Sequence, residues 1–210
     1  AVALGFGYYL SSAFPGLPSN IVAAVLCLAF MFLNLIGAKE SASVNNVLVA
    51  IKLAILGFFI AFGALHASAG NFAPFVPLSS GVLYGSFYIF FAYGGFARIA
   101  VVAEEVKDAK RNVPLAMLLS LGISLIVYVL VGLVAVGLVG AGGLSGSNSN
   151  SPLPAAMSAA GSSLAVQIVS VGGLVATASV LLTAILGVSR MAFSMARGKD
   201  LPSALSRLHQ

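Results

Sequence analysis

The chain has 210 residues, of which 60% are hydrophobic and 7% are charged, and its net charge is +5. Soluble domains carry about 25% charged residues, so the composition excludes an ordinary soluble protein and predicts a membrane protein. In that class a positive net charge does not indicate a nucleic-acid partner, and we expect none. The placement of the charges along the chain is the informative feature.

Five apolar stretches are long enough to cross a bilayer as helices, which takes about 20 residues. They cover residues 21–38, 44–65, 81–103, 114–140 and 164–188, and residues 1–10 are expected to be the tail of a further span. The chain starts without Met inside an apolar run. We therefore expect one transmembrane domain, residues 1–210, that is a fragment of a longer protein. Between the last two spans, Pro152 to Ala160 is predicted to form a short outer-surface helix with Ser151 at its N-cap.

The segments between the spans alternate in charge. Residues 11–20, 66–81 and 141–163 contain no Lys or Arg, whereas residues 38–43, 104–112 and 190–210 hold eight of the ten. The positive-inside rule places the second set, including the C-terminal end, in the cytoplasm. Each assignment agrees with the next, so the predicted spans support one another.

Gly94 and Gly95 interrupt the span at 81–103. Each glycine weakens a helix by about 1 kcal/mol relative to alanine and frees the backbone to leave helical geometry. Unwound backbone inside a membrane is tolerated where it is buried in protein or lines a water-filled cavity, as in the substrate sites of transporters. The alternative is that these small residues let helices pack closely.

Three strings together resemble amino acid permeases of the amino acid-polyamine-organocation (APC) family. "FFAYGGFARIAVVAEEVKDAKRNVPLAML" is similar to the sixth transmembrane segment and its following loop, and "GVSRMAFSMARGKDLP" to the end of the eighth. "NLIGAKESASVNNVLVAIKLAIL" is similar to the hairpin of the fourth and fifth segments. The resemblance covers about residues 20–205. The string "ARGKDLP" departs from the family's usual "ARDGLLP".

The resemblance implies an all-α polytopic membrane protein, part of a transporter fold of two inverted five-helix repeats with a discontinuous helix near Phe91–Phe96. The fragment would run from the end of the third to the eighth segment. The first helix, which would receive a substrate carboxylate, is absent. The implied location is the prokaryotic cytoplasmic membrane.

The implied substrate site surrounds the break in that helix. Backbone carbonyls of Phe91, Ala92 and Gly94 are candidates to receive a substrate ammonium group, and the rings of Phe91 and Tyr93 would form an apolar wall. The alternative is that these aromatic residues pack within the span in the ordinary way or belong to an aromatic belt at the membrane interface. The candidate substrate-binding residues are Phe91, Ala92, Tyr93, Gly94, Gly95, Phe96 and Ala97.

A group of charges follows the break. Arg98 costs about 2.5–3.5 kcal/mol at the centre of a span and needs a partner or water, and we favour a structural role for it. The other members form either a solvated cluster or a cytoplasmic gate that pairs in one state and separates in another. They are Glu104, Glu105, Lys107, Lys110 and Arg111.

Lys52 lies within the span at 44–65, about 12 Å along the helix from Val44. It could snorkel toward the surface, but Asn45 lies seven residues earlier on the same face, which indicates a polar stripe directed into the bundle. The resemblance implies that the ammonium of Lys52 fills the place of a sodium ion and meets a hydroxyl such as that of Ser179 or Thr183. Small-residue packing is the ordinary explanation for those two hydroxyls.

An enzyme is not expected, because the sequence contains no metal-ligand spacing and no G-x-S-x-G motif. No cofactor is expected either. We interpret the protein as a proton-coupled secondary active transporter that works by alternating access on a small, neutral or weakly polar amino acid. Its partners would be the substrate, protons, the lipid bilayer and the missing helices. A channel, or a receptor or scaffold of the same fold, is the open alternative.

Overall fold

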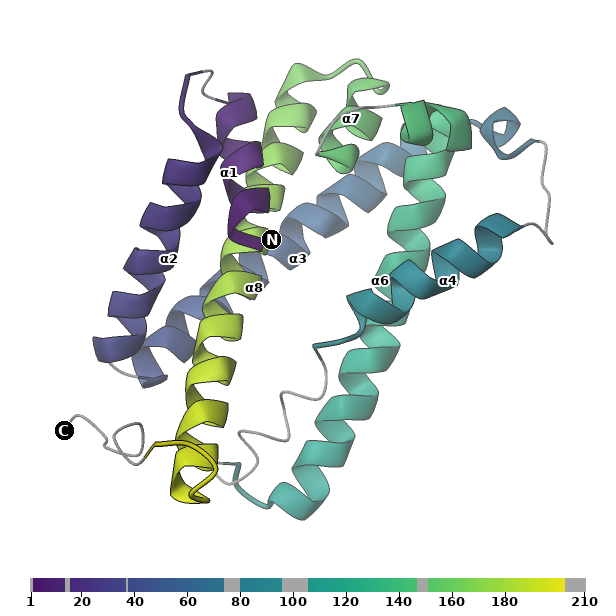
Figure 1. The fold of residues 1–210 in the computed structure, drawn as a ribbon. Coiled ribbons are helices and arrows are strands. Elements are labelled where there is room, and N and C mark those ends of the chain that lie inside the picture. The colour runs from purple at the N-terminus through teal and green to yellow at the C-terminus, as the bar shows by residue number, and fades with distance from the viewer. Residues whose placement is uncertain are drawn as a thin grey trace.

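The computed structural model describes residues 2–13, 16–36, 38–73, 80–95, 106–146 and 151–202, and these contain helices without strands. The helices, labelled as in Figure 1, are α1 (Val2–Ala13), α2 (Ser19–Ile36), α3 (Ala38–His66), the 3-10 helix η1 (Ala69–Phe72), α4 (Ser80–Ala92), α6 (Ala109–Gly146), α7 (Pro152–Ser158) and α8 (Ser163–Arg197). The all-helical architecture implied by the family resemblance is confirmed for these residues.

Three of the described helices are long and apolar enough to cross a bilayer. Their spanning portions are Ser43–His66 of α3, Ala109–Leu144 of α6 and Ser163–Arg197 of α8. They coincide with the predicted spans 44–65, 114–140 and 164–188 and extend beyond the last two. The predicted span 21–38 corresponds to α2, whose 18 residues rise about 27 Å. This length is close to the bilayer core of about 30 Å.

Helix α4 is shorter than the predicted span 81–103. It has 13 residues and ends at Ala92, which gives a length of about 20 Å. Residues 93–95 follow as a turn, and residues 96–105 lie outside the described residues. The helix therefore ends next to the glycine pair, where the sequence predicts a break.

Helix α8 is the centre of the bundle and packs against α1, α2, α3 and α7 (Figure 1). The end of α1, the start of α2, the helix α7 and η1 lie on one side of the molecule. The end of α2, the start of α3, the start of α6 and the end of α8 lie on the opposite side. The start of α6 and the end of α8 hold basic residues of the set predicted to be cytoplasmic. Which side of the membrane they face stays a prediction.

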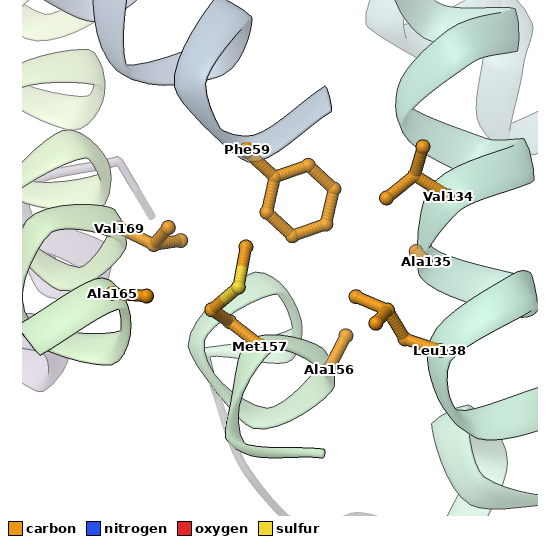
Figure 2. Packing of buried hydrophobic residues seen from close by; sticks show 8 residues of the cluster. All are labelled: Phe59, Val134, Ala135, Leu138, Ala156, Met157, Ala165 and Val169. Atoms are coloured by element: carbon orange, nitrogen blue, oxygen red, sulfur yellow. The ribbon is translucent and has the colours of Figure 1, made fainter. Parts of the chain in front are cut away.

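Helix α7 is seated in an apolar core between the three long helices (Figure 2). Met157 and Ala156 are completely buried, and Phe59 of α3 is 1% exposed beside them. The prediction of a short helix here agrees with α7, which has Pro152 in its first turn and ends at Ser158 rather than Ala160. Ser151 occupies the N-cap position but its side chain makes no capping hydrogen bond. The other members of the core are Val134, Ala135, Leu138, Ala165 and Val169.

Helix α6 has a kink at Gly140, whose backbone is non-helical at φ 70° and ψ 166°. Glycine adopts this positive φ without the steric cost of a Cβ atom. One turn earlier, the Gly137 carbonyl accepts hydrogen bonds from the Ser68 N–H at 2.8 Å and from Asn71 Nδ2 at 2.7 Å. These bonds attach the segment around η1 to α6 beside the kink.

Candidate functional site

Lys52 lies on the inner face of α3 and contacts α8. Its Nζ donates a hydrogen bond to Ser179 Oγ at 3.5 Å. Ser179 is 2% exposed and donates to Asn45 Oδ1 at 2.8 Å. Asn45, Lys52 and Ser179 are called the Lys52 cluster below, and its hydrogen bonds join α3 to α8.

Helical periodicity explains how the Lys52 cluster forms. Asn45 and Lys52 are seven residues apart, about two turns, and so lie on the same face of α3. Small residues on α8 let its neighbours approach. A Cβ atom added to Gly172 would meet Ile55 of α3, and one added to Gly173 would overlap the Tyr9 ring of α1.

The two hydroxyls proposed from the sequence as partners of Lys52 differ in position. Ser179 contacts the lysine, as described above. Thr183 lies one turn further along α8, and its Oγ1 donates to the Ser179 carbonyl at 2.9 Å and to the Val180 carbonyl at 3.1 Å. The structure therefore brings Ser179 to Lys52, while Thr183 hydrogen-bonds to its own helix.

A cavity of about 140 Å³ adjoins the Lys52 cluster. A cavity of this size can hold several water molecules, given that polar groups are present to bind them. Lys52 of α3 and Tyr9 of α1 supply polar groups on a lining that is otherwise mostly apolar. Tyr9 was not among the site residues expected from the sequence, because its helix begins the chain, outside the strings that carry the resemblance.

At the end of α4 the backbone hydrogen bonds change from the α-helical pattern to the 3-10 pattern. The Tyr93 N–H donates to the Ile89 carbonyl at 3.2 Å in helical register, but the Gly94 N–H donates to the Phe91 carbonyl at 3.1 Å, one residue short of that register. A Cβ atom on Gly94 would lie 3.2 Å from the Phe91 oxygen, which is a tight contact, whereas Gly95 faces open space. The Phe91 carbonyl, expected to receive substrate, thus already accepts one hydrogen bond and keeps a second lone pair.

Tyr93 connects the end of α4 to α6. Its ring meets that of Tyr128 edge to face, with centroids 5.4 Å apart. The Tyr93 hydroxyl is buried and has no hydrogen-bond partner among the described residues. Both rings line a cavity of about 710 Å³ bounded by η1, α4 and α6. Tyr128 was not among the site residues expected from the sequence.

The other site residues predicted from the sequence lie outside the described residues or on the surface. Phe96, Ala97, Arg98, Glu104 and Glu105 lie outside the described residues. Lys107, Lys110 and Arg111 are exposed around the start of α6, and their role in a gate stays a prediction. Within the described part of the chain, no group of three His, Cys, Asp or Glu side chains could hold a metal ion.

Comparison with known proteins identifies relatives along the whole chain. A methylthioribose transporter of Bacillus subtilis (strain 168) is 31% identical over 98% of this chain, and the branched-chain amino acid permease BcaP of the same organism is 29% identical over 98%. Cationic amino acid transporter 9, chloroplastic, of Arabidopsis thaliana is 33% identical over 90%.

The chain spans about half the length of the bacterial relatives it matches, 46% of each, and 33% of the plant protein. The sequence pattern of the amino acid permease family matches residues 1–210. The three strings in the sequence, the apolar spanning helices and this match agree. The chain is an integral membrane protein and belongs to the amino acid permease family.

Proposed function

We propose that this chain is part of a proton-coupled secondary active transporter of amino acids. The observation that carries the proposal is the contact of Lys52 with Ser179, which places an ionisable amine between two spanning helices. Relatives whose names state amino acid transport support the substrate class. The relative named for methylthioribose transport shows that substrates differ among similar sequences.

The coupling step is the gain and loss of one proton at Lys52 Nζ. The amine binds a proton from the side where substrate enters and becomes an ammonium, which donates to Ser179 and holds α3 against α8. Release of that proton to water on the other side removes the charge and weakens the contact. One positive charge therefore crosses with each cycle, and the helices move between outward-open and inward-open states.

Substrate binds at the end of α4 in this proposal. The backbone around Phe91, Ala92 and Gly94 presents carbonyl oxygens to the substrate ammonium, and Tyr93 forms part of the wall. The cavity of about 710 Å³ extends from Tyr93 to Asn71 in η1, so it offers a route toward the η1 side of the molecule. We assign that side to the exterior, because the segments rich in Lys and Arg lie on the opposite side.

The decisive experiment measures uptake into proteoliposomes that hold the full-length transporter containing this chain. An imposed inward pH gradient, without sodium, is expected to drive accumulation of substrate above the bath concentration, which a channel cannot do. Lys52→Ala is expected to lose the dependence on the gradient. The exposed Lys199, as Lys199→Ala, is the matched control and is expected to keep it. An absolute requirement for sodium, or full pH dependence in Lys52→Ala, would overturn the proposal.

Ala97 predicts the charge class of the substrate. Its methyl group offers no counter-charge, and burying an unpaired charge costs several kcal/mol. Arginine and lysine should therefore compete with labelled alanine at least about a hundredfold more weakly than neutral amino acids do. Competition assays in the same proteoliposomes check this, and strong inhibition by arginine at equal concentration would contradict it.

A further inference from the structure

The hydrogen bonds of the Lys52 cluster have a definite direction. A serine hydroxyl has one proton and two lone pairs, and an ammonium group donates without accepting. Ser179 directs its proton to Asn45 Oδ1 at 2.8 Å. Its lone pairs are therefore what Lys52 Nζ meets at 3.5 Å.

This direction distinguishes the two protonation states of the lysine. A neutral amine has a lone pair and could accept the Ser179 proton, whereas the ammonium can only donate. Asn45 competes with the neutral amine for that single proton. With Asn45 in place, the contact favours the ammonium over the amine.

The described lining of the cavity beside the lysine adds one further titratable group. This is Tyr9 of α1, whereas α7 contributes the apolar Leu153. From α8, Thr177 lines it, but its Oγ1 donates to its own helix at the Gly173 carbonyl, at 2.8 Å. No carboxylate is among the described residues that line the cavity, and α2 and α6 contribute no residue to it.

We propose that Asn45 is a positioning residue for proton coupling: it holds the Ser179 hydroxyl in the orientation that accepts a hydrogen bond from protonated Lys52. This inference rests on the proposed function and adds a second residue of α3 to it. Asn45 acts through Ser179 and does not contact the substrate or the transferred proton.

The test compares two neighbouring asparagines in the full-length transporter. Asn45 is half-buried and Asn46 is exposed on the same helix. The pH that gives half-maximal substrate exchange is measured in proteoliposomes. Asn45→Ala is expected to move this value about half to one pH unit toward acid, a three- to tenfold change in proton affinity. Asn46→Ala is expected to leave it unchanged.

Asn45→Asp is expected to shift the half-maximal pH in the opposite direction. A carboxylate still accepts the Ser179 proton and adds a negative charge near the ammonium, so the half-maximal pH should move toward alkali. A role in packing alone would reduce the amount of inserted protein without moving the pH profile in either direction. An unchanged half-maximal pH in both Asn45 variants overturns the proposal.

Variants that fail to insert into the membrane also give a clear result. If Asn45→Ala does not insert, a shift of the half-maximal pH toward alkali in Asn45→Asp supports the proposal, and no shift or a shift toward acid overturns it. If neither variant inserts, Asn45 is a folding residue and the proposal is wrong. Lys52→Ala distinguishes failure of the proposed function from failure of this inference. If Lys52→Ala keeps the pH dependence of transport, proton coupling at Lys52 is wrong. If Lys52→Ala loses it while the Asn45 variants keep the wild-type half-maximal pH, only the role of Asn45 is wrong.

Discussion

Ser179 on α8 is 2% exposed, whereas Phe90 and Phe91 at the end of α4 are 76% and 66% exposed. The first belongs to a region in which α3 and α8 pack along their lengths, with glycines at the contact. The second belongs to a helix whose aromatic rings mainly contact one another, as Phe87 does with Tyr88 and Phe91. The two regions proposed to move the proton and to bind the substrate are thus built differently.

The two regions obtain their geometry from different kinds of contact. The Lys52 cluster depends on contact between two helices, and its residues Lys52 and Ser179 are 127 positions apart in the sequence. The end of α4 depends on backbone hydrogen bonds within three or four residues. Exposed apolar side chains on α4 cost little in a bilayer, because lipid tails are as apolar as the rings themselves. A helix of this kind can keep its shape with few tertiary contacts.

The largest effect is expected in the packed region. Met157→Ala removes a completely buried side chain from between α3, α6 and α8. Substitutions of this kind lower the free energy of unfolding by about 2–5 kcal/mol. Thermal denaturation of the purified protein in detergent measures the loss. Met191 on α8 is 48% exposed, and Met191→Ala is expected to change stability little. Equal losses in both variants would show that burial of α7 is not what stabilises this region.

The next effect is expected at the end of α4, on transport rather than on stability. Gly95→Leu meets no atom within 4 Å of the new Cβ, so the variant should insert normally. A leucine at the proposed substrate site should reduce uptake about a hundredfold, because displacing a bound group by about 1 Å can cause a loss of that size. Gly85→Leu is the control, since that glycine also faces open space on α4. Normal uptake by Gly95→Leu would favour close packing as the reason for the glycine pair.

The smallest effect is expected where η1 attaches to α6. Asn71→Ala removes the 2.7 Å hydrogen bond to the Gly137 carbonyl, but the Ser68 N–H still satisfies that carbonyl. The expected loss of stability is about 0.5–1.5 kcal/mol, typical of one hydrogen bond. Thermal denaturation measures it beside Asn46→Ala, which changes an exposed side chain. A loss as large as that of Met157→Ala would place η1 within the packed region.

The membrane class and the family could both be predicted from the sequence, and the family match confirms them. Runs of about 20 apolar residues and the alternation of charged loops are local properties, so they can be read without knowing any contact. The end of α4 was also predictable, because adjacent glycines weaken a helix wherever they occur. Residues 2–10 lie in α1, which extends to Ala13. That this helix is the tail of a further span stays a prediction.

Which polar groups contact one another depends on how the helices pack together. From the sequence, Ser179 and Thr183 were equivalent partners for Lys52, since both lie on one face of the same helix. The angle and register at which α8 crosses α3 bring Ser179 to the lysine and leave Thr183 bonded to its own helix. The contact of Tyr93 with Tyr128 and the burial of Met157 likewise depend on how separate helices are placed. Local patterns contain no information on that placement, because it results from packing between segments far apart in the chain.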